Sequence, residues 1–182
     1  MRGRGHRLIV ALALAASVVA VAGCGSVEDA GRTFPAPSVG PSMTVSPAVN
    51  QTRTELVGVL GQHGLQLADT QTPVRMAESP LLTTAPRAVY QVVLPKDPDK
   101  GYIVVYEFSD PSLAAAAAAE QQAYLGSGPG RVQTPQGTIS VIRQVGSTVV
   151  LYQWLPGAAQ DPSAPGIQDA LETLGIGFPV AT

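Results

Sequence analysis

The sequence predicts an α+β domain in which three helices pack on an antiparallel sheet of about four to five strands. Residues 88–94 and 102–108 are rich in β-branched and aromatic residues and are separated by a polar turn. An alanine-rich helical stretch follows at 110–125. A second pair of strand-like segments is separated only by Gly146-Ser147, which suits a tight hairpin.

A short helix is expected at the start of this domain. Thr52 and Glu55 have the spacing of a capping box, and Gly64 is suited to end the helix. Residues 65–67 then alternate between apolar and polar, which predicts a short first strand. One face of the helix carries Leu56, Val59, Leu60 and His63.

The two strands at 88–94 and 102–108 carry apolar residues on both faces, so we expect them near the centre of the sheet. They are joined by the turn-forming sequence PKDPDKG. Residues 70–86 contain three prolines and predict a loop, with a short irregular strand at 81–82.

The strongest helix prediction begins at Asp110, which can cap the helix, with Pro111 at its first position. Gly126 is expected to end it, and residues 127–137 read as a flexible loop. The residues expected to face the sheet are Leu113, Ala117, Tyr124 and Leu125.

The hairpin comprises residues 138–145 and 148–155. A last amphipathic helix is expected over 167–174, ending at Gly175, and Phe178 of the tail is expected to pack back on the domain.

The first twenty-four residues have the layout of an export signal. Three arginines precede an apolar run over residues 8–22, and small residues lead to Cys24. This stretch, ending Val21-Ala22-Gly23-Cys24, resembles the signal peptide of bacterial lipoproteins, whose lipobox reads apolar, small, Gly or Ala, then Cys. The resemblance implies cleavage between Gly23 and Cys24 and attachment of fatty acyl chains, such as palmitate, at Cys24.

Two alternatives to a lipoprotein signal are a membrane-spanning anchor and a plain secretory signal. The apolar run is shorter than the roughly 20 residues of a spanning helix. A plain signal requires no cysteine, yet the only cysteine of the chain stands at the lipobox position. The expected organisation is therefore a signal peptide over 1–23, the lipidated Cys24 with a disordered Pro/Ser-rich linker over 24–50, and a single domain over 51–182.

The charge of the chain argues against a nucleic-acid partner. All thirteen acidic residues follow Cys24, whereas three of the eleven basic residues precede it. The part beyond the signal is therefore acidic, and nucleic-acid binding requires a basic face.

The sequence indicates no catalytic set, metal site or cofactor. His63 is the only histidine after the signal, and at a helix end its charge would complement the helix dipole. Asp97 and Asp99 lack the spacing of a calcium loop and fit a turn. Glu107 and Asp110 are better explained as a strand residue and a helix cap than as an acid–base pair.

Aromatic residues on the predicted strands are the candidate ligand-binding residues. They are Tyr102, Tyr106, Tyr152 and Trp154. An exposed aromatic sheet face would bind a partner protein, a glycan or an apolar ligand. The alternative is that these side chains fill the core beneath the helices.

We therefore expect a lipid-anchored protein on the extracytoplasmic face of a bacterial cell membrane, with a noncatalytic role in binding or envelope organisation. One alternative is an envelope hydrolase or transferase that uses carboxylates alone, which requires two acids, or His63 and an acid, at the base of a cleft. Another is a carrier of a lipid or other apolar ligand, which requires an enclosed apolar cavity.

Overall fold

The computed structural model describes residues 45–180. The predicted signal peptide, the lipidation site at Cys24, the cleavage site at Gly23 and most of the predicted linker lie outside these residues. Within the part that is described, no helix has both the length and the apolarity needed to cross a bilayer.

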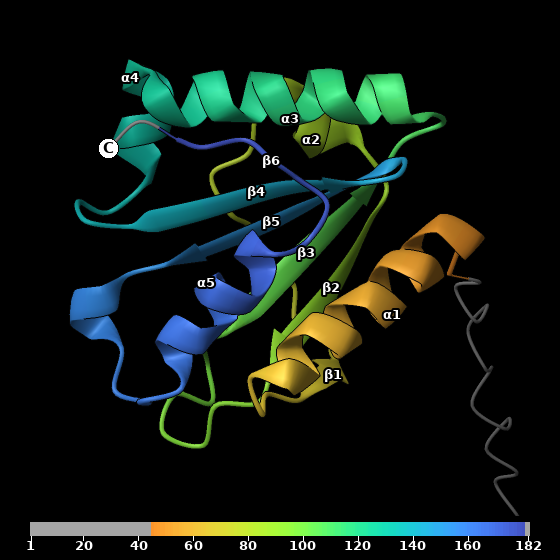
Figure 1. The fold of residues 1–182 in the computed structure, drawn as a ribbon. Coiled ribbons are helices and arrows are strands. Elements are labelled where there is room, and N and C mark those ends of the chain that lie inside the picture. Colours follow the sequence, from red (N-terminus) through yellow and green to blue (C-terminus); the bar gives the residue numbers. More distant parts are fainter. Residues whose placement is uncertain (1–44, 181–182) are drawn as a thin grey trace, which may run out of the picture. The chain divides into compact units, whose positions relative to one another are not determined.

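The core of the protein is one antiparallel sheet with the strand order β1-β2-β3-β5-β4-β6 (Figure 1). This confirms the predicted α+β class and the central position of β3. The two outer strands are very short, and the prediction of four to five strands missed one of them. The strands are β1 (Leu67–Asp69), β2 (Arg87–Val92), β3 (Tyr102–Glu107), β4 (Ile139–Val145), β5 (Thr148–Trp154) and β6 (Ile176–Gly177).

Helices cover both faces of the sheet, so the architecture has three layers (Figure 1). Helices α1 and α5 pack on one face, and α2 and α3 pack on the other, with α4 extending from the end of α3. The helices are α1 (Pro47–Gln62), α2 (Pro80–Thr84), α3 (Pro111–Gly126), α4 (Gly128–Gln133) and α5 (Ala164–Glu172).

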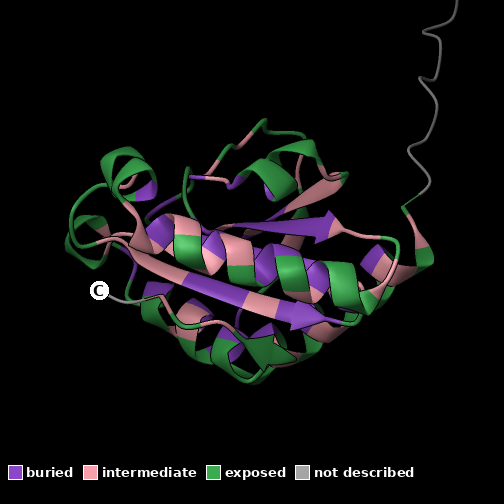
Figure 2. Ribbon diagram, turned by 90° about the horizontal axis from the view of Figure 1, so that it is seen from above, coloured by how far each residue is buried: buried purple, intermediate pink, exposed green. Residues whose placement is uncertain are grey.

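Successive side chains of the central strands point to opposite faces of the sheet, and they form two separate cores. In β5, Val150 and Tyr152 enter the core beneath α1 and α5, whereas Val149 and Leu151 enter the core beneath α2 and α3. The central strands are therefore buried over most of their length (Figure 2). Each such aliphatic side chain contributes about 1.5–3 kcal/mol through its removal from water.

The N-cap of helix α1 lies six residues earlier than predicted. Ser46 is its N-cap, and the Ser46 hydroxyl oxygen accepts a hydrogen bond from the amide of Val49 at 3.2 Å. The cap predicted at Thr52 is wrong, because Thr52 is buried and its hydroxyl lies 2.8 Å from that of Thr148 on β5. The predicted end is confirmed, since Gly64 follows the helix with a φ of 70°.

Two short helices replace structure that was predicted as irregular. Helix α2 occupies the position of the irregular strand expected at 81–82, and α4 lies within the expected loop 127–137. Both helices have a proline in their first turn. The segment before α2 is fixed by Gln121 of α3, whose side chain accepts from the amide of Ser79 and donates to the carbonyl of Ala77, both at 2.6 Å.

Helix α3 has the predicted cap and the predicted end. One carboxylate oxygen of Asp110 accepts from the amides of Ser112 and Leu113, both at 2.9 Å. The prediction that Leu113 faces the sheet is wrong, because this side chain is 50% exposed. The buried face of α3 consists of three alanines, at positions 114, 117 and 118, together with Gln121 and Leu125.

The hairpin of β4 and β5 and the packing of the tail are confirmed. Gly146 has a φ of 55° in the two-residue turn between these strands. After α5, Gly175 turns the chain so that β6 pairs with β4, and Phe178 then packs against the core beneath α3.

Replacing Gly175 tests whether the turn after α5 requires glycine. Its φ is 45°, and a Cβ atom would lie 2.0 Å from the carbonyl oxygen of Gln144. We expect Gly175→Ala to lower the free energy of unfolding by about 1–3 kcal/mol, measured by chemical denaturation.

The matched control is Gly58→Ala on α1, where a Cβ atom meets nothing within 4 Å. This change should stabilise the protein by about 0.5–1 kcal/mol, because alanine favours a helix. Equal effects of the two substitutions would contradict the steric explanation.

Candidate functional site

Two adjoining hollows lie where β5 ends, and Gln153, Trp154 and Leu155 line both. The first, here called the β5 groove, has a volume of about 550 Å³. Its other lining residues are Arg75, Met76, Ala77, Gln133, Thr134, Pro135 and Thr138. The second, here called the aromatic cavity, has a volume of about 230 Å³. Its walls include Leu94, Asp97, Lys100, Tyr102, Tyr152 and Ala159.

Three of the four predicted aromatic residues line the aromatic cavity: Tyr102, Tyr152 and Trp154. Tyr152 and Trp154 leave β5 on the face covered by α1 and α5, whereas Tyr102 of the neighbouring strand β3 has the parity of Val104 and Tyr106, which face α2 and α3. Tyr152 is fully buried, which raises the pKa of its phenol. Tyr102 and Trp154 are half-buried and can contact a ligand.

Tyr106, the fourth predicted residue, does not belong to this site. It is fully buried at the other end of β3, in the core beneath α2 and α3. Its hydroxyl donates to a Glu78 carboxylate oxygen at 2.8 Å, and the same oxygen lies 2.7 Å from the guanidinium of Arg87. Burial, together with Glu78, raises the pKa of Tyr106. The alternative prediction, that such aromatics fill the core, describes Tyr106 correctly.

A side chain of α5 fixes the orientation of Trp154. Its indole nitrogen donates to the Gln168 side-chain oxygen at 3.1 Å, and the Gln168 amide donates to Glu172 at 2.8 Å. Because the polar edge of the indole is already bonded within the protein, the apolar surface of the ring is what remains for a ligand.

Two loops at this end of the sheet are joined by a reciprocal pair of carboxylates, here called the Asp97–Asp161 clasp. Asp97 accepts from the amides of Gln160 at 2.7 Å and Asp161 at 2.8 Å. Asp161 accepts in return from the amides of Lys96 at 3.0 Å and Ser163 at 2.9 Å. The clasp joins the β2–β3 loop to the loop before α5.

Both carboxylates of the clasp have a lowered pKa. For Asp97 the largest cause is the hydrogen bond from the Asp161 amide, and Lys100, whose ammonium lies 3.0 Å away, adds to it. For Asp161 the largest cause is the hydrogen bond from the Lys96 amide. Each loop is therefore held by a charged carboxylate, and neither group is suited to donate a proton near neutral pH.

The sequence predicted Asp97 as a turn residue but missed its partner Asp161. A signal was present, because each aspartate is followed by a proline, in Asp97-Pro98 and Asp161-Pro162. Such dipeptides favour turns. They do not reveal that two turns 64 residues apart hold each other.

The other residues considered for catalysis, His63 and Asp110, are helix caps. His63 caps the C-terminal end of α1 and is exposed, and Asp110 caps α3. Between residues 45 and 180, no three His, Cys, Asp or Glu side chains are grouped as metal ligands.

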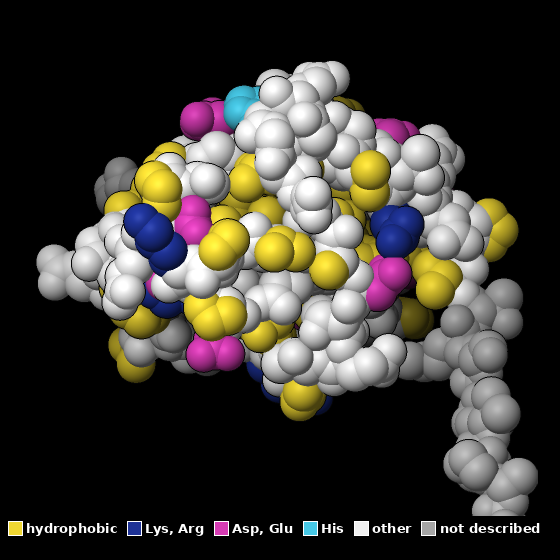
Figure 3. All heavy atoms as spheres, turned by 90° about the horizontal axis from the view of Figure 1, so that it is seen from below, with side chains coloured by type: hydrophobic (Ala, Val, Ile, Leu, Met, Phe, Trp, Pro, Cys, Tyr) yellow, Lys and Arg dark blue, Asp and Glu magenta, His cyan; other side chains and the backbone are white. Residues whose placement is uncertain are grey.

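The lining of the β5 groove contains one cation and no acid. Arg75 is exposed there, and no aspartate or glutamate is among the lining residues. On the face covered by α1 and α5, by contrast, basic and acidic side chains lie in small mixed groups (Figure 3).

Comparisons of the chain with protein-family models, with curated proteins and with solved structures found no match. The candidate site is therefore defined by the position and chemistry of its own residues. Its components are the β5 groove, the aromatic cavity and the Asp97–Asp161 clasp.

The clasp predicts a pH dependence of stability. A carboxylate with a lowered folded-state pKa contributes stability that is fully present above its ordinary pKa of 3.8 and is lost as the pH falls through the lower value. Asp97→Asn should therefore lower the melting temperature at pH 7, and the difference from wild type should shrink below about pH 4. Thermal unfolding followed from neutral to strongly acidic pH measures this.

Asp99→Asn is the matched control, since Asp99 is exposed in the same loop. It should leave the stability of the protein nearly unchanged across the pH range. A deficit in Asp97→Asn that stays constant down to low pH would argue against a charge-dependent clasp.

Proposed function

We propose that this protein is a bacterial lipoprotein, anchored through acyl chains on Cys24 to the extracytoplasmic face of the cell membrane, whose domain is a noncatalytic binding module. The order of residues 1–24 supports the anchor. The binding role is supported mainly by the position of Tyr102, Tyr152 and Trp154 in the lining of the aromatic cavity, at one end of the sheet.

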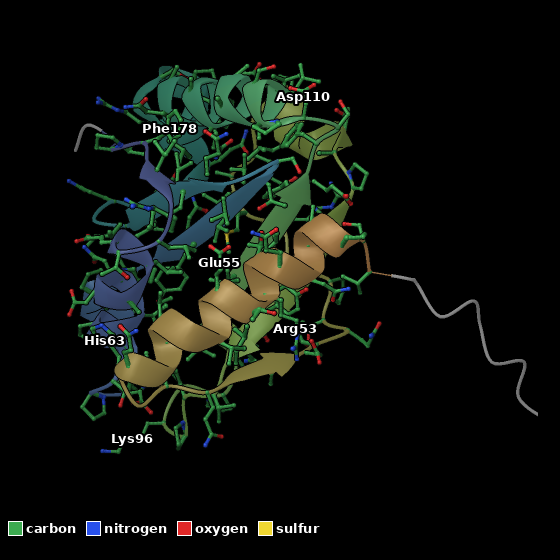
Figure 4. All side chains as sticks on the ribbon, turned by 45° about the vertical axis from the view of Figure 1, so that its right-hand side comes forward. Arg53, Glu55, His63, Lys96, Asp110 and Phe178 are labelled. Carbon is green, nitrogen blue, oxygen red and sulfur yellow. The ribbon has the colours of Figure 1, made fainter. Side chains whose placement is uncertain are left out.

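This end of the sheet lies far from the start of the described chain. Helix α1 has 16 residues, so it extends about 24 Å. Its early residue Thr52 contacts Thr148, the first residue of β5, whereas the hollows lie beyond the last residue of β5. In Figure 4, His63 at the end of α1 and Lys96 of the β2–β3 loop lie near each other, opposite Asp110.

Val45, the first described residue, lies just before α1, at the end of the sheet opposite the hollows.

The side chains at the site favour binding over catalysis. Asp97 and Asp161 accept backbone hydrogen bonds, and the β5 groove is lined without a carboxylate. The alternative of a carboxylate-dependent hydrolase or transferase is not favoured, because the paired carboxylates Asp97 and Asp161 accept backbone hydrogen bonds that lower the pKa of both. The aromatic cavity does not support the alternative of an apolar carrier, because its volume is smaller than the roughly 300–1,000 Å³ of most ligand pockets.

Acyl labelling tests the anchor. We expect wild-type protein in its native host to incorporate an alkyne fatty acid and to sediment with membranes, whereas Cys24→Ala should lose the label and remain uncleaved or be released. Gly25→Ala, one residue beyond the site, is the matched control and should keep the label. Membrane retention of wild type without any acyl label would refute the anchor.

Photocrosslinking in intact cells tests the binding site. A benzophenone residue at Gln133, in the wall of the β5 groove, should form a specific adduct with an envelope component. The same residue at Gln51, exposed near the start of α1, is the control and should form none. Absence of an adduct at Gln133, or equal adducts at both positions, would count against a binding site in the groove.

A further inference from the structure

The aromatic cavity continues the core that lies beneath α1 and α5. Part of its lining belongs to that core or packs against it, namely Leu94, Tyr152, Trp154, Ala159 and Ala164. Tyr152 and Trp154 leave β5 on this face, and Ala164 is the first residue of α5. This wall of the cavity is therefore mainly apolar, and it can remove the apolar surface of a ligand from water as the core does for its own side chains.

Tyr152 places a hydroxyl without a partner in this wall. The side chain is 1% exposed and lines the cavity. Among residues 45–180 no group forms a hydrogen bond with this hydroxyl, and burial is the only cause that raises the pKa of the phenol. A buried hydroxyl that makes no hydrogen bond destabilises the folded state, so a ligand atom that accepts its proton would recover this cost.

The charged groups in the wall of the cavity are already paired or open to water. The ammonium of Lys100 lies 3.0 Å from the carboxylate of Asp97 and also donates to the carbonyl of Ala158. Asp97 accepts in addition from two backbone amides, and Asp99 is exposed. A charged ligand would lose its hydration on entering and would find no free charge of opposite sign among these groups. The wall therefore favours an uncharged ligand.

The volume of the cavity limits the size of the ligand. It is about 230 Å³. A cavity of about 150 Å³ engineered in another protein binds benzene, so the aromatic cavity has room for a single aromatic ring with a short substituent. The half-buried ring of Trp154 favours an aromatic ligand, because aromatic rings attract each other in offset and edge-to-face arrangements.

We propose that the aromatic cavity binds a small uncharged molecule with one aromatic ring and a hydrogen-bond acceptor, which accepts from the Tyr152 hydroxyl while its ring packs beside Trp154. This inference rests on the proposed binding function and names the chemical class of the ligand. A carbonyl oxygen attached to the ring is a suitable acceptor, because it accepts a hydrogen bond without carrying a charge.

The experiment uses acetophenone, in which a carbonyl is attached to one ring, and ethylbenzene, which has a similar shape and no acceptor. Full-length protein in detergent is titrated with each probe, with protein-free micelles as the blank. Trp154 is the only tryptophan of the chain and lines the cavity, so its indole N–H signal in a nitrogen–proton NMR spectrum reports on this site. We expect acetophenone to shift this signal saturably.

Tyr152→Phe is the test variant and Tyr90→Phe is its matched control. Both tyrosines lie on the same face of the sheet, because each pairs with Ile103 of β3. Within the described chain the buried hydroxyl of Tyr90 also lacks a partner, but Tyr90 does not line the cavity. We expect Tyr152→Phe to weaken acetophenone binding about three- to tenfold through loss of one hydrogen bond, and to leave ethylbenzene binding unchanged. Tyr90→Phe should bind both probes as wild type does.

A third variant, Ala159→Leu, adds bulk to the cavity wall and should weaken the binding of both probes. Circular dichroism of the three variants checks that the fold is retained. Benzoate, which replaces the ketone by a charged carboxylate, should bind at least about tenfold more weakly than acetophenone.

Four results would overturn the inference: no saturable shift with acetophenone, equal acetophenone binding by the two tyrosine variants, an equal loss of both probes in Tyr152→Phe, and benzoate binding as tight as that of acetophenone. If acetophenone does not bind but the Gln133 adduct persists in cells, the proposed binding function stands with another ligand class and this inference alone fails. If the adduct is also absent, both fail.

Discussion

The pairing of β3 with β5 is the constraint on which the rest of the structure depends. These strands form the centre of the sheet, and each sends side chains into a core on either face. Both faces must then be covered by helices, because an uncovered face would expose a continuous apolar surface. With both faces covered, the ends of the strands and the two edges of the sheet remain open to solvent. The candidate site lies at one of these ends for this reason.

The elements with a strong local pattern could be predicted from sequence. β3, β5 and α3 follow clear periodicities, and Asp110 and Gly146 have the local chemistry of a cap and a turn. The start of α1 was missed because Ser46 and Pro47 lie in a proline-rich stretch that resembles a linker. Thr52 has the chemistry of a cap, but a residue 96 positions away uses its hydroxyl instead. Helices α2 and α4 have five and six residues, too few for a periodicity to be read.

The site was predictable in residue type but not in position. Tyr102 and Tyr106 are the same residue type on the same strand, yet one lines the aromatic cavity and the other is buried beside Glu78. What separates them is which end of β3 is open, and this depends on loops distant in sequence. Asp161 was missed because its role comes from Asp97, which the chain brings beside it only on folding.

The short outer strands have a consequence for the membrane anchoring that we propose. β1 and β6 have three and two residues, and β6 pairs with only Arg143 and Gln144, so most of the outer edge of the seven-residue β4 has no strand beside it. Long open edges template the addition of strands from other molecules, which leads to aggregation. Copies concentrated in two dimensions would meet edge to edge often. In that setting, the part of β4 that β6 leaves uncovered would be the edge most open to such addition.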